Sequence, residues 1–274
     1  MRRFVIVLLL LGVAIAVAQE RYGRRRGYRQ AVPPQGVDDP SWEVDPKFKK
    51  DVFTFVRIRY SDGGGWRRGG GWDTDWPASD INFSYRLQQL TAMKVNPEPI
   101  VLDLTDERLF EYPWIYMIEP GRLYFSEEEV LALRRYLLTG GFLMVDDFWG
   151  EREWENFYQQ IKRVFPDREP EELSSDHAIF NCVFPIDGKP QIPSIHAWYN
   201  FYGSGRTWEQ WDAQEAHYKG LYDDKGRLMA IICHNTDLGD GWEREGENVE
   251  YFREMSERSA YPLGINIVFY AMTH

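Results

Sequence analysis

Cysteine is scarce in this chain of 274 residues, which contains only Cys182 and Cys233. A small scaffold that depends on several disulfides is therefore excluded. The two thiols could pair with each other in an oxidising compartment, or they could remain separate as small buried side chains. The sequence leaves both alternatives open.

Net positive charge is also absent. The 43 acidic residues outnumber the 32 lysines and arginines, which gives a formal net charge of -11. Because such a chain has no overall attraction for phosphate backbones, we do not expect nucleic acid as a partner. The hydrophobic fraction of 43% is typical of a globular protein, and the chain is long enough to bury a sizeable core.

Apolar runs of membrane-spanning length are missing as well. The longest run, residues 4–17, is shorter than the roughly 20 residues that cross a bilayer. It follows Arg2 and Arg3 and ends in the small-x-small sequence of residues 16–18, which is the three-part layout of a secretory signal peptide. We therefore predict that residues 1–18 are a cleaved signal peptide. The mature chain would be exported to the periplasm or the extracellular space and would have no stable membrane span.

Residues 19–50 show no hydrophobic periodicity. Gly, Pro, Gln and Arg dominate this segment, which predicts a disordered basic linker. From residue 51 onward, short apolar strands alternate with amphipathic helices, and this alternation predicts a single α/β domain over residues 51–274 with a mostly parallel sheet.

The individual elements follow from local patterns. Strands are predicted at residues 52–60, 100–102, 114–118 and 142–145, and helices are predicted after a cap at Ser79 or Asp80, after a cap at Ser126, and over 151–164. In the C-terminal half we expect β structure over 177–184, a hairpin insertion over 185–205, a second hairpin formed by 218–222 and 227–233, and a helical region from about 247 that Pro262 interrupts.

Several segments together resemble a known bacterial family. They are FVRIRY at 55–60, WPASD at 76–80, YPWIY at 112–116, YLLTGGFLMVDD at 136–147, HAIF at 177–180 and LGIN at 263–266. Over residues 52–273 the chain resembles the domain-of-unknown-function family numbered 4159. That family is similar in fold to class I glutamine amidotransferase-like domains. The resemblance thus implies a flavodoxin-like three-layer α/β/α sandwich, here with β-hairpin insertions in the C-terminal half. It implies no reaction, because the family has no established activity, and the exported relatives suggest only a binding or assembly role.

The amidotransferase reaction needs a nucleophilic cysteine on a tight strand-to-helix turn. The equivalent turn here is VDDFWG at residues 145–150, which holds neither cysteine nor serine. Cys182 and Cys233 both lie in segments with β patterns. We therefore reject glutamine hydrolysis as the activity of this chain.

Asp146 and Asp147 are the sharpest candidates for a site. They end a predicted strand, and in open α/β sheets ligands bind beyond the carboxyl ends of the strands. The pair could bind a metal or act as acid and base, or it could cap the next helix and accept hydrogen bonds from backbone amides. His234, Asn235 and Asp237 follow another predicted strand and could reach the same edge of the sheet.

His177 and His196 are further candidates, but the histidines lack the close spacing of a zinc site, and we predict no metal. The glycine-rich loop at 61–77 lacks the Gly-Lys-Ser/Thr of a phosphate-binding loop. Its Trp66 and Trp72 could contact a sugar or a partner protein, or they could fold back and close the core.

Together these observations predict an exported, non-catalytic binding or assembly domain of the bacterial cell envelope. Its ligand-facing cleft would contain Asp146, Asp147, His177, His234, Asn235, Asp237, Trp66 and Trp72. The carboxylates would accept hydrogen bonds and the tryptophans would supply apolar contact. No cofactor is predicted, and the partner would be an envelope protein or a small ligand. Two alternatives stay open: an Asp/His-dependent hydrolase, with or without a divalent metal, and a carbohydrate-binding module that uses the Trp-rich loops.

Overall fold

The computed structural model describes residues 42–48, 51–62 and 71–274. All of them belong to one compact unit within residues 33–274. The predicted signal peptide, most of the predicted linker and Trp66 lie outside the described residues.

The centre of the domain is a seven-stranded sheet with the order β3-β1-β4-β6-β9-β8-β7. The strands are β1 (Val56–Arg59), β3 (Ile100–Asp103), β4 (Trp114–Ile118), β6 (Phe142–Asp146), β7 (Glu171–Glu172), β8 (His217–Tyr222) and β9 (Leu228–His234). The first five strands in the sheet are parallel, and β8 and β7 extend it by antiparallel pairing. Numbered along the chain, the parallel strands follow the flavodoxin-like order 2-1-3-4-5. A separate two-stranded sheet pairs β2 (Ser61–Asp62) with β5 (Leu123–Tyr124).

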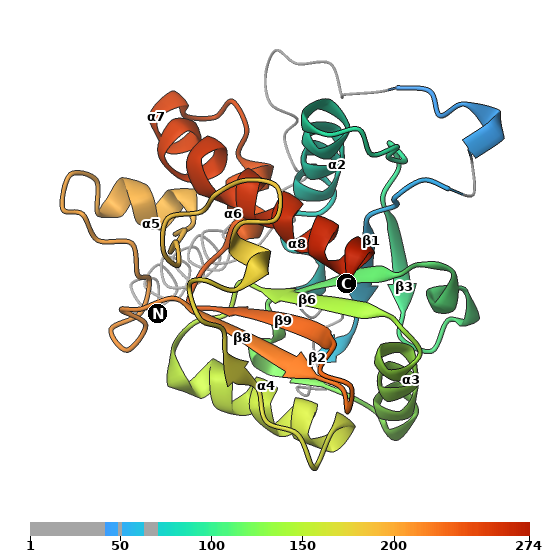
Figure 1. Cartoon of the computed structure of the whole chain (residues 1–274). Helices are drawn as coiled ribbons and strands as arrows, with labels where there is room; N and C mark the ends of the chain where they lie inside the picture. Colours follow the sequence, from blue (N-terminus) through green and yellow to red (C-terminus); the bar gives the residue numbers. More distant parts are fainter. Residues whose placement is uncertain (1–41, 49–50, 63–70) are drawn as a thin grey trace, which may run out of the picture. The chain divides into compact units, whose positions relative to one another are not determined.

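Helices cover both faces of the sheet (Figure 1). The α-helices are α2 (Ala78–Leu90), α3 (Glu127–Leu138), α4 (Gly150–Val164), α5 (Ile195–Asn200), α6 (Leu238–Glu243), α7 (Val249–Tyr251) and α8 (Tyr261–Thr273). Short 3-10 helices occur at η2 (Pro46–Phe48), η3 (Gly71–Asp73), η4 (Glu107–Glu111), η5 (Pro120–Arg122) and η6 (Ala178–Phe180), and η7 (Phe252–Ala260) is a π-helix. No helix in the described part of the chain combines the length and the apolar character needed to cross a bilayer.

Each face of the sheet buries its own apolar core, because successive residues of a strand point to opposite faces. Tyr116 and Met144 belong to the core that includes α2, α6 and α8, whereas Met117 and Val145 belong to the core that includes α3 and α4. The arrangement confirms the predicted three-layer α/β/α sandwich with a flavodoxin-like, mostly parallel sheet.

The predicted cap of α3 is confirmed. The Ser126 hydroxyl accepts a hydrogen bond from Glu129 N, and the Glu129 carboxylate accepts one from Ser126 N. The predicted cap of α2 is wrong, because the helix starts at Ala78 without a side-chain cap. Ser79 and Asp80 are instead hydrogen-bonded to a buried arginine, Arg57.

The C-terminal half departs further from the prediction. Residues 177–184 hold the short helix η6 rather than a strand, and residues 185–205 form a loop and helix α5 rather than a hairpin. The second hairpin is confirmed as β8 and β9, joined by a turn in which Gly226 has φ 79°. Pro262 does not interrupt the helical region. It sits in the first turn of α8, directly after the π-helix, where no intrahelical hydrogen bond from its nitrogen is required.

Both cysteines are free thiols, so the alternative of a disulfide is wrong. Cys233 is buried within β9, and Cys182 is exposed, with its Sγ 3.2 Å from the carbonyl oxygen of Asn266.

Candidate functional site

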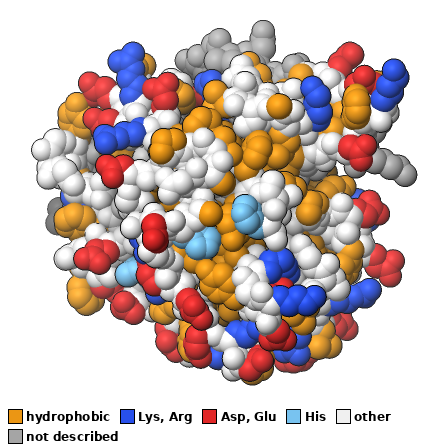
Figure 2. All heavy atoms as spheres, in the orientation of Figure 1, with side chains coloured by type: hydrophobic (Ala, Val, Ile, Leu, Met, Phe, Trp, Pro, Cys, Tyr) orange, Lys and Arg blue, Asp and Glu red, His pale blue; other side chains and the backbone are white. Residues whose placement is uncertain are grey.

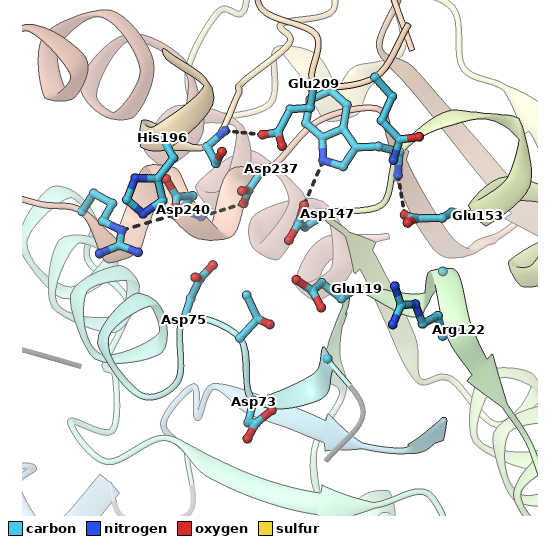
Figure 3. Close-up of a pocket in the computed structure, with 17 residues that line it drawn as sticks. Asp73, Asp75, Glu119, Arg122, Asp147, Glu153, His196, Glu209, Asp237 and Asp240 are labelled. Carbon is cyan, nitrogen blue, oxygen red and sulfur yellow. Dashed lines mark hydrogen bonds and ion pairs between the residues drawn. The ribbon is translucent and has the colours of Figure 1, made fainter. Parts of the chain in front are cut away.

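A cleft of about 620 Å³ lies at the carboxyl edge of the parallel strands. Loops that follow β1, β4, β6 and β9 line it, and the segment around α5 closes one side (Figure 3). Strands β1 and β4 mark the point where the chain reverses its direction of winding, which is where flavodoxin-like folds bind ligands. The lining residues are Gly71, Asp73, Thr74, Asp75, Glu119, Gly121, Arg122, Asp147, Trp149, Glu153, Ser194, His196, Glu209, Gln210, Asp237, Asp240 and Arg244.

The lining is strongly acidic. Eight of these residues are aspartate or glutamate, whereas only Arg122, Arg244 and His196 can be positively charged. Figure 3 shows carboxylates from separate loops pointing toward a common space. On the face drawn in Figure 2, by contrast, acidic and basic side chains are interspersed around the periphery and hydrophobic ones gather over the middle. The cleft therefore differs from that face in gathering acidic side chains with few basic ones among them.

Left-handed backbone conformations also gather at this edge. Among the described residues, four that are not glycine have positive φ: Asp75 (61°), Glu119 (48°), Asp147 (54°) and Asn235 (61°). Asp and Asn tolerate this region better than other residue types, yet such conformations persist only where the surroundings enforce them. Backbone bonds between neighbouring strand ends do so here, since Glu119 N donates to Asp146 O and Asp147 N donates to Thr236 O.

Asp146 lies beneath the cleft and supports it. Its Oδ2 accepts hydrogen bonds from Leu238 N at 2.9 Å and Gly239 N at 3.0 Å. It also accepts one from the Tyr116 hydroxyl at 3.0 Å. Complete burial raises the pKa of Asp146 to about 7, although these donors act in the opposite direction. Asp146 thus bonds backbone amides, as the structural alternative predicted, but they belong to α6 and not to the turn that follows β6. The other half of that alternative is wrong, because α4 begins without a side-chain cap.

Asp147 lines the cleft at the turn between β6 and α4. Trp149 Nε1 donates to its Oδ1 at 3.0 Å. Only 9% of the residue is exposed, and its Oδ2 accepts no hydrogen bond from any described residue. Burial raises the pKa of Asp147 well above its usual range, and the nearby charge of Glu119 raises it further.

The buried Arg57 on β1 fixes the loop that carries Asp73 and Asp75. Its Nη1 donates to the carbonyl oxygens of Trp72 at 3.0 Å and Thr74 at 2.7 Å. The remaining donors bind the start of α2, with Nε 3.0 Å from Asp80 Oδ2 and Nη2 2.9 Å from Ser79 Oγ, and Nη2 also pairs with Asp80 Oδ1. All five N–H groups of the guanidinium are therefore used within the protein.

A compact carboxylate group lies at one end of the cleft, where Asp75, Asp240 and Glu243 each place an oxygen within 4.8 Å of the others. Asp240 Oδ2 accepts from Ile195 N at 2.5 Å, and its Oδ1 lies 3.3 Å from Arg244 Nε. Burial and mutual repulsion raise the pKa of Asp75 well above its usual range.

The family of the chain follows from its match to a family model. Residues 54–272 match the model described as Domain of unknown function (DUF4159). The chain belongs to this family. No curated protein matches it. The matched residues include every strand of the central sheet and every residue of the cleft, so the DUF4159 domain contains the whole site.

The DUF4159 domain brings together only part of the predicted site. Asp147 and Asp237 line the cleft, as predicted, and Asp146 supports it from below. Asp237 accepts a hydrogen bond from Asp240 N at 2.7 Å and thereby caps α6. Trp72 is half-buried against the core and does not line the cleft.

The predicted histidines have structural roles or lie elsewhere. His234 is buried, and its ring packs at a tilt against Phe148 and Trp154. Burial lowers its pKa to about 4. Asn235 accepts from Gly150 N at 2.8 Å and ties two loops together. His177 caps the short helix η6 and packs against Tyr270 near the C-terminus, away from the cleft residues.

Several lining residues were missed by the sequence analysis. Glu119 directly follows a predicted strand, so the rule applied to Asp146 and Asp147 would have found it. Asp73 and Asp75 stand in the glycine-rich loop after the first strand, of which only the tryptophans were predicted to be site residues. Glu209 follows the segment 185–205, whose path has no local signal. His196, named as a further candidate from the sequence, does line the cleft, from α5.

The chemistry available in the cleft is that of carboxylates. Neither cysteine lines it, and no described hydrogen bond joins Asp146 or Asp147 to a histidine. His196 is the one histidine among the lining residues. The arrangement can attract positive charge and bind hard cations, and its donors to an anionic ligand are few.

Proposed function

We propose that this chain is an exported, non-catalytic binding or assembly domain of the bacterial cell envelope, and that its ligand carries positive charge into the acidic cleft. The observation that supports this most strongly is the convergence of eight carboxylic acids and only two arginines at the switch point of the sheet. A low-dielectric, concave site of one sign focuses the field and favours a ligand of the opposite sign.

The surroundings of the cleft carboxylates favour binding over catalysis. Asp146 is engaged by two backbone amides and a tyrosine, and Asp147 by Trp149. A base hydrogen-bonded to a nucleophile is the usual sign of covalent catalysis, and neither aspartate has a histidine in that role. These features agree with an amidotransferase-like fold that has lost its thiol, which we include in the proposal.

Calorimetric titration of the full chain with the polyamine spermine tests the proposal. We expect measurable binding that weakens as the salt concentration rises. The double variant D147N/D237N should weaken it at least about tenfold, because it removes two cleft charges while asparagine retains the shape and tolerates the backbone at Asp147. The matched control E128Q/E257Q removes two charges from exposed residues that do not line the cleft and should leave the affinity unchanged.

The proposal fails if spermine does not bind, or if the control weakens binding as much as the cleft variant does. The second result would mean that spermine responds only to net charge.

Carboxylate-dependent hydrolysis is a second candidate, and one observation favours it. Burial raises the pKa of Glu119 to about 7, which is the range of a general acid at neutral pH. Turnover of chromogenic ester, phosphate and glycoside substrates by the full chain, abolished in E119Q, would support hydrolysis. Absence of turnover in the wild-type chain would favour binding alone.

Carbohydrate binding through tryptophans is a third candidate, and one observation favours it. Trp211 has 83% of its surface exposed, beside the insertion that closes the cleft. Trp72 is half-buried, and so offers less of its ring for stacking. Binding of envelope glycan that W211A abolishes would favour this alternative.

A further inference from the structure

We infer that Asp75, Asp240 and Glu243 bind one divalent cation, and that the ion is calcium. The inference deepens the proposed function, and rests on it only in taking the cleft as the ligand-binding end of the domain. Within the described part of the chain, these residues are the one set of three or more acidic, histidine or cysteine side chains that converge closely enough to share an ion.

The three oxygens are close enough for one ion to contact all of them, since they all lie within 4.8 Å of one another. Ca²⁺ accepts six to eight oxygen ligands in flexible arrangements, whereas Mg²⁺ demands near-ideal octahedral geometry and gives up its water reluctantly. A group of carboxylates brought together from two separate segments of the chain therefore suits calcium better.

Asp75 presents an oxygen that lacks a partner. Its Oδ2 is buried and accepts no hydrogen bond from any residue that the structure describes. A buried carboxylate oxygen without a donor is costly, which points to a cation or proton as its missing partner. Glu243 Oε2, in the same group, is likewise a buried oxygen that accepts no hydrogen bond from the described residues.

The loop geometry keeps Asp75 in this position. A Cβ atom at Gly239 would lie 2.9 Å from Asp75 Oδ2 and also 2.9 Å from the Tyr116 hydroxyl, so only glycine allows the carboxylate to approach α6 this closely. Figure 3 shows Asp75 pointing across toward Asp240. The two carboxylates come from loops that follow different strands, β1 and β9, and they meet only in the folded domain.

Local positive charge does not balance the group. Among the described residues, Arg244 is the one arginine paired with it, with Nε 3.3 Å from Asp240 Oδ1 and 2.6 Å from Glu243 Oε2. Three carboxylates and one guanidinium leave a formal charge of two negatives when all are ionised, which one divalent ion neutralises. The donors are all oxygen, which selects hard ions such as calcium over zinc or copper.

The experiment is a calorimetric titration of the full chain, freed of metal by a chelator that is then removed, with CaCl₂ and separately with MgCl₂. We expect one Ca²⁺ per chain with a Kd of roughly 10⁻⁴–10⁻³ M, the range of extracellular calcium modules. Mg²⁺ should bind at least about tenfold more weakly, because it demands octahedral geometry and dehydrates reluctantly.

The variant D75N/E243Q should weaken Ca²⁺ binding at least about tenfold. The control E128Q/E257Q makes the same change of charge on exposed residues and should bind like the wild type. Thermal unfolding without calcium checks that the variant folds, and its Tm should no longer rise when calcium is added. Asparagine accepts the left-handed backbone of Asp75, so no strain is introduced there.

Three results would overturn the inference: no Ca²⁺ binding by the wild-type chain, unchanged binding by D75N/E243Q, or equal affinity for the two ions. The spermine titration separates this inference from the proposed function. Calcium binding without spermine binding would leave the metal site and remove the proposed ligand class, and spermine binding without calcium binding would do the reverse.

Discussion

Replacing Arg57 with lysine should destabilise the domain severely and disorganise the cleft loop. The guanidinium is fully buried, and its five N–H groups bind the carboxylate of Asp80, the hydroxyl of Ser79 and the carbonyl oxygens of Trp72 and Thr74. Lysine keeps the positive charge but offers three donors from a single nitrogen. At least two of the five bonds are therefore lost, whatever position the ammonium adopts.

The expected cost follows from those bonds. A buried hydrogen bond to a charged group contributes about 1.5–3 kcal/mol, so the loss of two costs roughly 3–6 kcal/mol. Breaking a buried ion pair costs about 3–5 kcal/mol, which agrees. We therefore expect R57K to lower the free energy of unfolding by about 3–5 kcal/mol, a large part of the roughly 5–15 kcal/mol of a typical domain.

Urea unfolding followed by tryptophan fluorescence and by circular dichroism measures this free energy. The double variant R57M/D80L should cost less than the sum of R57M and D80L, because removing both partners leaves no unpaired buried charge. Additive costs, or a loss below about 1 kcal/mol in R57K, would refute the view that this arginine fixes the loop.

Three further predictions concern pH, packing and the thiols. The pKa values of Asp146 and Glu119 are raised by burial to about 7 from 3.8 and 4.5, so the folded state binds more protons than the unfolded state between about pH 4 and pH 7. Between pH 5 and pH 8 stability should therefore fall by roughly 5 kcal/mol, because each of the two groups contributes about 1.4 kcal/mol per pH unit until its folded-state pKa is reached, and it should then level off. Urea unfolding over this range measures the change, and stability that rises with pH would contradict it. G239A should lower the free energy of unfolding by about 1–3 kcal/mol in the same assay, because its Cβ would crowd Asp75 and Tyr116. An unchanged unfolding midpoint would show instead that the neighbouring loops move to accommodate the methyl group. Native protein should react with a thiol reagent at Cys182 and not at Cys233, with both reacting after denaturation. Thiols that become reactive in denatured protein only after a reductant is added would indicate a disulfide and contradict the assignment.

The fold was predictable because its strands and helices have strong local patterns. The run at 114–118 is a strand with all five residues buried, and the capping box at Ser126 forms as its sequence indicates. The predictions fail where contacts between distant segments determine the role of a side chain. Ser79 and Asp80 read as caps of a helix, but Arg57, more than twenty residues earlier, takes their side chains.

The cleft was predictable only in part, for a similar reason. The rule that ligands bind at carboxyl ends of strands located Asp147 and Asp237, since each follows a recognisable strand. His177 was misplaced because residues 177–184 were interpreted as a strand, whereas they form a short helix beside α8. No local pattern predicts that Glu209 lies at the edge of the sheet. Its position depends on a hydrogen bond from Ser194 N, fifteen residues earlier in the chain.

The cleft concentrates features that oppose folding. Three residues with left-handed backbone, Asp75, Glu119 and Asp147, line the same space, and burial raises the pKa of each carboxyl. Left-handed conformations of ordinary residues cost about 1–3 kcal/mol each, with aspartate at the low end, and neutral alternatives such as asparagine would remove the repulsion at no cost in backbone geometry. Local rules are broken in this way mainly where function requires it. Under the proposed function, a cationic ligand would give the same carboxylates a favourable partner, and the features that weaken the free domain would be the source of its affinity.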